Sequence, residues 1–191
     1  MSRQSNLLEV DWSTIPAPPN DGATRHLSGK QISDVFLAAT DGSRVCLSAL
    51  SGRTVVYAYP MTGQPGMALP DGWDEVPGAR GCTPQSCAFR DHYQDLIAAG
   101  ARHVFGLSTQ DTEYQREAAQ RLHLPFPLLS DDKFELSSEI GLPTITLDSK
   151  MLLKRLALVI NDGRITKVFY PVFPPDRNAA DVLAWLRENP G

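Results

Sequence analysis

Residues 54–60 read Thr-Val-Val-Tyr-Ala-Tyr-Pro, a continuous run of β-branched and aromatic side chains that ends at a proline. Such a run is typical of a strand that is buried in the middle of a sheet. The stretch therefore predicts a central strand. The elements on both sides of it indicate how that strand is covered.

Strand and helix patterns alternate around this central run. Upstream, residues 35–37 and 45–47 flank a glycine-containing turn, which predicts a β-hairpin near the N-terminus. Downstream, apolar periodicity predicts strands at 103–107 and 126–129, a second hairpin at 155–170, and helices at 84–97, 111–122, 132–140 and 178–188. This order predicts an α/β domain with a central mixed sheet and helices on both faces.

Composition favours one ordinary globular domain. The 191 residues are 42% hydrophobic and 21% charged, and we assign 31–191 to the domain and the proline-rich residues 1–30 to an extended arm. The formal net charge of −4 argues against a nucleic-acid partner. No apolar run reaches the roughly 18 residues of a membrane helix. Residues 1–20 lack the apolar stretch of a secretory signal, so we expect a cytoplasmic protein.

The chemistry is concentrated in residues 81–87, which read Gly-Cys-Thr-Pro-Gln-Ser-Cys and follow a long loop rich in proline and glycine. Cys82 falls at the predicted start of a helix, where free N–H groups and the helix dipole favour a thiolate. It is therefore a candidate nucleophile; the alternative is a small buried hydrophobe. Cys87 is either a second redox thiol or part of the helix core, and Cys46 is expected to be a core residue.

A disulfide between the two active-site cysteines would require a change in the helix. On an α-helix, residues five apart have Cα atoms roughly 8 to 9 Å apart. Because a disulfide needs Cα atoms within about 7 Å, Cys82 and Cys87 can pair only if the helix opens locally.

Residues 77–91, Pro-Gly-Ala-Arg-Gly-Cys-Thr-Pro-Gln-Ser-Cys-Ala-Phe-Arg-Asp, resemble the active-site segment of peroxiredoxins of the bacterioferritin-comigratory, or Q, type. The resemblance extends over about 34–170 and includes the segments 105–109 and 126–131. It implies a thioredoxin-like fold and reduction of hydrogen peroxide or alkyl hydroperoxides. Cys82 would become a sulfenic acid, and Cys87 would resolve it to a disulfide. A thioredoxin or similar dithiol would reopen that disulfide, and no metal or organic cofactor would be needed.

The resemblance also assigns supporting residues. Arg155 matches the family's arginine beside the sulfur; the alternative is an ordinary surface arginine. The family's Pro-x-x-x-Thr-x-x-Cys pattern is interrupted, because Ala79 occupies the threonine position and Pro60 lies 22 residues before the cysteine instead of seven.

We assign this gap to a loop inserted at 61–78. Thr62 is a candidate for the displaced peroxide-orienting hydroxyl, with Thr83 as the local substitute; the alternative for Thr62 is a turn residue. Thr83, Gly81 and Pro60 are expected to surround the peroxide.

Several alternatives remain open. A copper-binding thioredoxin-like module would use a cysteine pair and a distant histidine, but its cysteines are usually spaced Cys-x3-Cys. In a redox sensor or interaction protein, Cys82 would be oxidised and a partner would recognise the unwound helix. Three apolar residues of the insertion, Met61, Met67 and Trp73, could wall the pocket, cover a subunit contact or anchor the loop. Arg80 is expected to be an exposed loop residue; the alternative is that it adds positive potential near the sulfur. We expect a monomer or homodimer.

Overall fold

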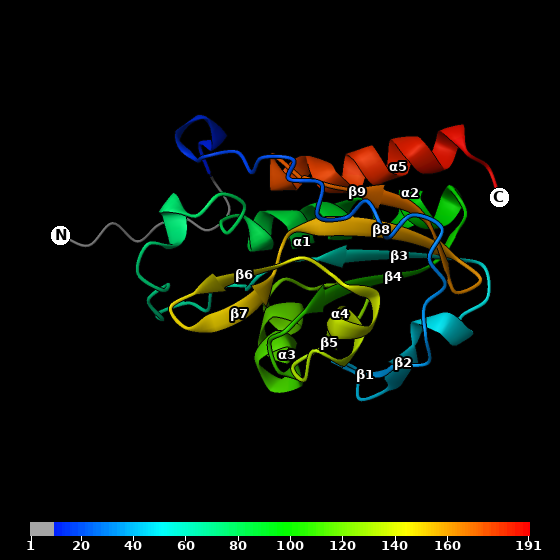
Figure 1. Cartoon of the computed structure of the whole chain (residues 1–191), viewed down its shortest axis with the longest axis horizontal. Coiled ribbons are helices and arrows are strands. Elements are labelled where there is room, and N and C mark those ends of the chain that lie inside the picture. Colours follow the sequence, from blue (N-terminus) through cyan, green and yellow to red (C-terminus); the bar gives the residue numbers. More distant parts are fainter. Residues whose placement is uncertain (1–9) are drawn as a thin grey trace.

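The computed structural model describes residues 10–191, so the first nine residues of the predicted arm lie outside the described part. Its centre is a mixed sheet of seven strands in the order β2-β1-β5-β4-β3-β8-β9, and a separate hairpin is formed by β6 and β7 (Figure 1). The strands are β1 (Phe36–Ala39), β2 (Arg44–Cys46), β3 (Arg53–Ala58), β4 (Ala101–Ser108), β5 (Leu128–Ser130), β6 (Thr144–Leu147), β7 (Lys150–Leu153), β8 (Leu156–Asn161) and β9 (Arg164–Phe169).

The predicted central strand, β3, lies between parallel β4 and antiparallel β8. Its side chains alternate between two cores: Val55 and Tyr57 belong to one, and Val56 and Ala58 to the other. All four are completely buried. The apolar run therefore reflects a strand that is covered on both faces.

Helices pack against both faces of the sheet (Figure 1). The core that contains Tyr57 also contains residues of α1, α2 and α5, whereas the opposite core contains residues of α4. The arrangement confirms the predicted α/β class, with a central mixed sheet and helices on both faces. The helices are α1 (Cys82–Asp91), α2 (Tyr93–Ala98), α3 (Thr112–Arg121), α4 (Glu135–Ile140) and α5 (Asn178–Glu188), with short 3-10 helices η1 (Trp12–Thr14), η2 (Leu47–Ala49), η3 (Trp73–Glu75) and η4 (Pro175–Arg177).

Two local predictions differ from the structure. The single helix predicted over 84–97 begins at Cys82 and is interrupted at His92, which separates α1 from α2. The β6–β7 hairpin was not predicted. Its turn uses Asp148 and Ser149 at positive φ instead of glycine, so the usual hairpin signal is missing.

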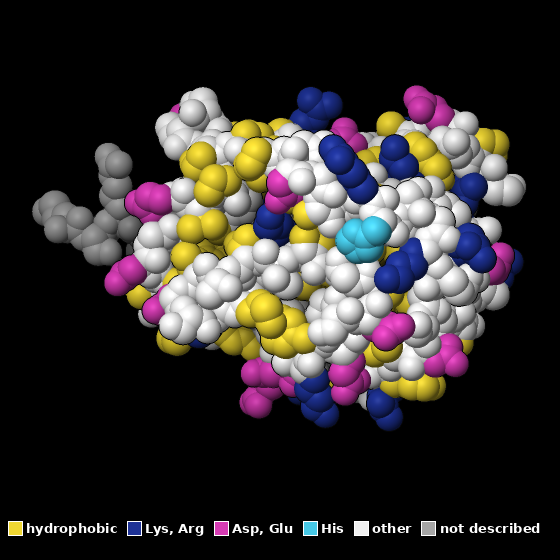
Figure 2. Space-filling model, viewed as in Figure 1, with side chains coloured by type: hydrophobic (Ala, Val, Ile, Leu, Met, Phe, Trp, Pro, Cys, Tyr) yellow, Lys and Arg dark blue, Asp and Glu magenta, His cyan; other side chains and the backbone are white. Residues whose placement is uncertain are grey.

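The predicted N-terminal hairpin, β1–β2, belongs to the main sheet because β1 pairs with β5. The segment before it is attached to the body. Leu27 is fully buried, and the backbone of Gly29 and Lys30 bonds to Ile165 in β9. In the view of Figure 2, many of the exposed hydrophobic side chains lie on the left half of the molecule. Within residues 10–191, no helix has the length and apolar character needed to cross a membrane.

Candidate active site

Cys82 occupies the first position of α1, where the chain turns out of the long loop. Gly81 precedes it with a φ of 104°, a left-handed conformation that favours glycine. A Cβ atom at Gly81 would also lie 2.6 Å from Pro175 and 2.7 Å from Trp12. Both the backbone angle and the packing therefore require glycine at this point, and together they set the direction in which α1 begins.

Arg155 contacts the sulfur of Cys82 directly. The guanidinium Nη2 donates to Cys82 Sγ at 3.2 Å, and both residues are almost fully buried, with 2% and 4% of their surfaces exposed. A buried guanidinium at this distance stabilises negative charge on sulfur, because screening by water is weak there. The same Nη2 lies within 3.0 to 3.3 Å of the carbonyl oxygens of Gly78, Ala79 and Arg80. Arg155 thus also fixes the backbone that leads into the helix.

Gln85 holds the guanidinium from the opposite side. Its Oε1 accepts a hydrogen bond from Arg155 Nη1, and its Nε2 donates to Asn178 Oδ1 at 2.9 Å. Both amide side chains are buried. This chain connects α1 to the first residue of α5, and sequence reasoning missed it because the partners are 93 and 70 residues apart. The sequence signal that could have indicated this contact was the polar residue Gln85 in the buried part of a predicted helix.

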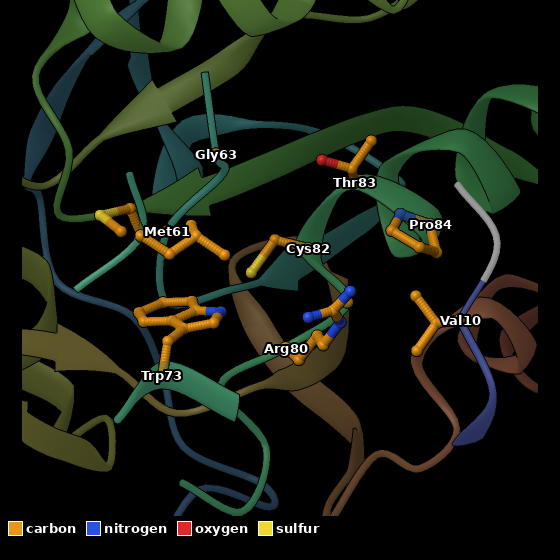
Figure 3. Close-up of a pocket in the computed structure, with 10 residues that line it drawn as sticks. Val10, Met61, Gly63, Trp73, Arg80, Cys82, Thr83 and Pro84 are labelled. Carbon is orange, nitrogen blue, oxygen red and sulfur yellow. The ribbon is translucent and has the colours of Figure 1, made fainter. Parts of the chain in front are cut away.

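A small cavity lies beside the sulfur (Figure 3). Its volume, counted for the centre of a water-sized molecule, is about 20 Å³. One water needs roughly 10–15 Å³ on this measure. The cavity is lined by Val10, Met61, Gly63, Leu69, Trp73, Arg80, Gly81, Cys82, Thr83 and Pro84. Trp73 lies beside the Cys82 side chain in Figure 3, Met61 lies farther along the same wall, and both come from the predicted insertion.

The two candidate threonines occupy different places. Thr83 lines the cavity and is 4% exposed. Thr62 is completely buried outside the cavity lining, and its hydroxyl bonds to Gln110 at 3.3 Å. Pro60 is also outside the lining, and its carbonyl accepts from Ser108. The geometry therefore brings Cys82, Arg155, Gly81 and Thr83 together, but not Thr62 or Pro60.

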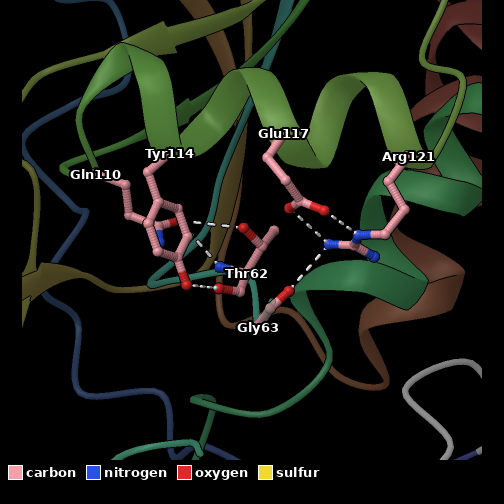
Figure 4. A network of polar contacts seen from close by, with 6 residues as sticks. All are labelled: Thr62, Gly63, Gln110, Tyr114, Glu117 and Arg121. Carbon is pink, nitrogen blue, oxygen red and sulfur yellow. Dashed lines mark hydrogen bonds and ion pairs between the residues drawn. The ribbon is translucent and has the colours of Figure 1, made fainter. Parts of the chain in front are cut away.

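The environment of Thr62 anchors the inserted segment to α3 (Figure 4). Tyr114 donates to the Thr62 carbonyl at 2.8 Å, and Arg121 donates to the Gly63 carbonyl at 3.0 Å while paired with Glu117. At the other end of the segment, Arg80 is mostly buried and paired with Asp74 at 2.6 Å, so the expectation of an exposed loop arginine was wrong.

The three cysteines are free. Burial raises the pKa of the Cys87 thiol, so in the intact helix this thiol stays protonated to a higher pH than an ordinary cysteine. Cys46 lies on β2, where its sulfur is 2.9 Å from the Ser48 hydroxyl. It takes part in none of the contacts of Cys82 and Arg155 described above. Among residues 10–191, no group of three or more His, Cys, Asp or Glu side chains is arranged to hold a metal ion.

Comparisons with known proteins identify the family of this chain. Residues 27–183 match the Redoxin family. The chain is 33% identical to peroxiredoxin Q of Triticum aestivum, over 90% of this chain and 75% of the relative, and 32% identical to that of Populus jackii, over 94% and 80%. The chain belongs to the peroxiredoxin Q family. It is accordingly a thiol-dependent peroxidase of the thioredoxin-like superfamily.

Solved peroxiredoxin structures have the same fold. Peroxidoxin BcpB of Mycobacterium tuberculosis superposes with a TM-score of 0.68 at 26% identity, covering 86% of this chain and 98% of that one. Peroxiredoxin Q of Xanthomonas campestris superposes with a TM-score of 0.64 at 22% identity, covering 82% and 91%. The second likeness shows the fold alone.

Proposed function

We propose that Cys82 reduces hydroperoxides, with Arg155 as its electrostatic partner and Cys87 as the resolving thiol. The observation that carries the proposal is the 3.2 Å contact between Arg155 Nη2 and Cys82 Sγ at the first residue of a helix. In a peroxiredoxin Q, this is the thiol placed best for nucleophilic attack.

The first step breaks the O–O bond of the peroxide. The Cys82 thiolate attacks one peroxide oxygen and forms an S–O bond, while the electron pair of the O–O bond leaves with the other oxygen. That oxygen takes a proton and departs as water or an alcohol, and Cys82 becomes a sulfenic acid. Arg155 stabilises the negative charge as it moves from sulfur to the leaving oxygen.

The second step removes the sulfenic oxygen. The Cys87 thiolate attacks the Cys82 sulfur, an S–S bond forms, and hydroxide leaves and is protonated to water. Backbone bonds such as Gln85 N–H to Gly81 C=O close the first turn of α1 in the reduced protein. The pairing therefore requires local opening of α1, which also takes Cys87 out of the buried setting that raises its pKa.

A dithiol then completes the cycle. One of its thiolates attacks the Cys82–Cys87 disulfide and forms a mixed disulfide, releasing one protein thiolate. Its second thiolate attacks the mixed disulfide and releases the other protein thiolate, so the donor leaves as a disulfide and both cysteines are reduced. We propose a thioredoxin-like donor. A cytoplasmic location and a monomeric or homodimeric state remain predictions; the plant relatives carry the description chloroplastic.

Cys87→Ser separates the two chemical steps. We expect the reduced variant to consume one equivalent of hydrogen peroxide at close to the wild-type rate, because Cys82 and Arg155 are unchanged. Steady-state turnover with a dithiol donor should fall about 100-fold, because the tethered resolving thiol is lost. Rapid-quench peroxide consumption and the coupled assay measure these quantities. Normal turnover by the variant would exclude Cys87 as the resolving residue.

The position of the threonines predicts unequal effects of their removal. Thr83→Val should slow the reaction with hydrogen peroxide about 10-fold, because the hydroxyl in the cavity wall no longer orients the peroxide. Thr62→Val should have a smaller effect on that rate, because its hydroxyl is bonded to Gln110 outside the cavity. Second-order rate constants of the reduced variants test this order. A larger loss for Thr62→Val would return the orienting role to Thr62.

A further inference from the structure

The inserted segment 61–78 forms a large part of the wall beside Cys82. Four of the ten residues that line the cavity belong to it: Met61, Gly63, Leu69 and Trp73. Trp73 lies beside the Cys82 side chain in Figure 3, and Met61 lies farther from it on the same wall. The cavity that these residues line together with Cys82 has a volume of about 20 Å³ for the centre of a water-sized molecule. The insertion therefore sets the volume in front of the sulfur.

This wall is fixed in place at several points. Trp73 is only 4% exposed and packs in the same core as Tyr57 and Cys82. Next to it, Asp74 forms the ion pair with Arg80, which leads into the active-site helix. The beginning of the segment is held by the bonds from Tyr114 and Arg121 shown in Figure 4. The side chains that limit the cavity thus belong to an anchored segment.

We propose that Trp73 and Met61 restrict the peroxidase to hydrogen peroxide by excluding hydroperoxides with bulky alkyl groups. Hydrogen peroxide exceeds water by one oxygen atom, so it is the hydroperoxide that needs the least room beside Cys82. A tert-butyl group would have to occupy volume that the indole and thioether side chains already fill. Close-packed side chains resist such displacement. The inference rests on the proposed function, because it assumes that Cys82 is the thiol attacked by peroxide.

The volume of the cavity, and not its polarity, is the property that distinguishes hydrogen peroxide from alkyl hydroperoxides. The wall that faces the sulfur is largely apolar, since Met61, Leu69, Trp73 and Val10 contribute to it. An apolar wall would favour an alkyl group if there were room, because burying that group removes apolar surface from water. Enlarging the cavity is therefore expected to improve the reaction with alkyl hydroperoxides more than the reaction with hydrogen peroxide.

The test compares second-order rate constants of the reduced enzyme with hydrogen peroxide and with tert-butyl hydroperoxide. For the wild type we expect a ratio above about 10 in favour of hydrogen peroxide. Trp73→Ala and Met61→Ala should each lower that ratio at least about 3-fold by accelerating the tert-butyl reaction. Met67→Ala is the matched control, because Met67 lies in the same segment, is 66% exposed and is outside the cavity lining.

The possible outcomes separate the inference from the function beneath it. A wild-type ratio near 1, or a ratio that Met61→Ala and Trp73→Ala leave unchanged, would overturn the size restriction while the peroxidase assignment stands. If Trp73→Ala does not fold, Met61→Ala against Met67→Ala decides the question. If neither peroxide oxidises Cys82 in the wild type, the proposed function itself fails and the inference fails with it.

Discussion

Cys82→Ser is expected to lower peroxide turnover by at least about 1,000-fold, because a serine hydroxyl is not ionised near neutral pH and is a far weaker nucleophile than a thiolate. Neither of the other thiols can replace it. Cys87 is buried with a raised pKa, and Cys46 is on β2 beside Ser48. A steady-state assay with hydrogen peroxide and a dithiol donor measures the loss.

Cys46→Ser is the matched control for this substitution. It removes a buried cysteine of the same chain but leaves the sulfur that Arg155 contacts. We expect it to retain turnover near the wild-type value. The assignment of Cys82 would be contradicted if Cys82→Ser remained active, or if Cys46→Ser were the inactive variant.

Arg155→Met should slow the reaction of the reduced enzyme with hydrogen peroxide by about 100- to 1,000-fold, because the variant loses the cation that stabilises charge on sulfur and on the leaving oxygen. The substitution also removes a donor from three loop carbonyls and from Gln85. We therefore expect its free energy of unfolding to fall by about 1–3 kcal/mol. The reaction rate must be measured at a temperature at which denaturation curves show the variant folded.

Two further variants distinguish charge from structure at this position. Arg155→Lys keeps a cation but cannot reach the sulfur, the carbonyls and Gln85 at once, so an intermediate rate is expected. Lys154→Met removes the adjacent cation, which pairs with Asp21 at 2.6 Å in a partly exposed contact, and should leave the rate nearly unchanged. Equal rates for wild type and Arg155→Met would reduce Arg155 to a structural residue.

Local sequence patterns were sufficient for much of the fold. The apolar run before Pro60 predicted β3, because a strand covered on both faces needs apolar side chains at successive positions. The loop followed by helical periodicity placed Cys82 near the start of α1. The β6–β7 hairpin had no such signal, since Asp148 and Ser149 form its turn without glycine.

The polar contacts of the site were less accessible to sequence reasoning. The bond between Gln85 and Asn178 depends on the packing of α5 against α1. The hydroxyl of Thr62 is bonded to Gln110, 48 residues along the chain, and no local pattern predicts that pairing. Arg155 was assigned from resemblance, and only the three-dimensional structure places its guanidinium on the sulfur. Long-range hydrogen bonds decide these positions, whereas periodicity reports only which face of an element is buried.

The most direct test of the account is the intact mass of the reduced protein, with peptide mapping, after one equivalent of hydrogen peroxide. The account predicts the loss of two hydrogens and a single bridge between Cys82 and Cys87, formed while Cys46 remains a free thiol. No change in mass, or slow addition of oxygen to methionines with all three thiols unreacted, would contradict the claim that Cys82 is an activated peroxide-reducing thiol.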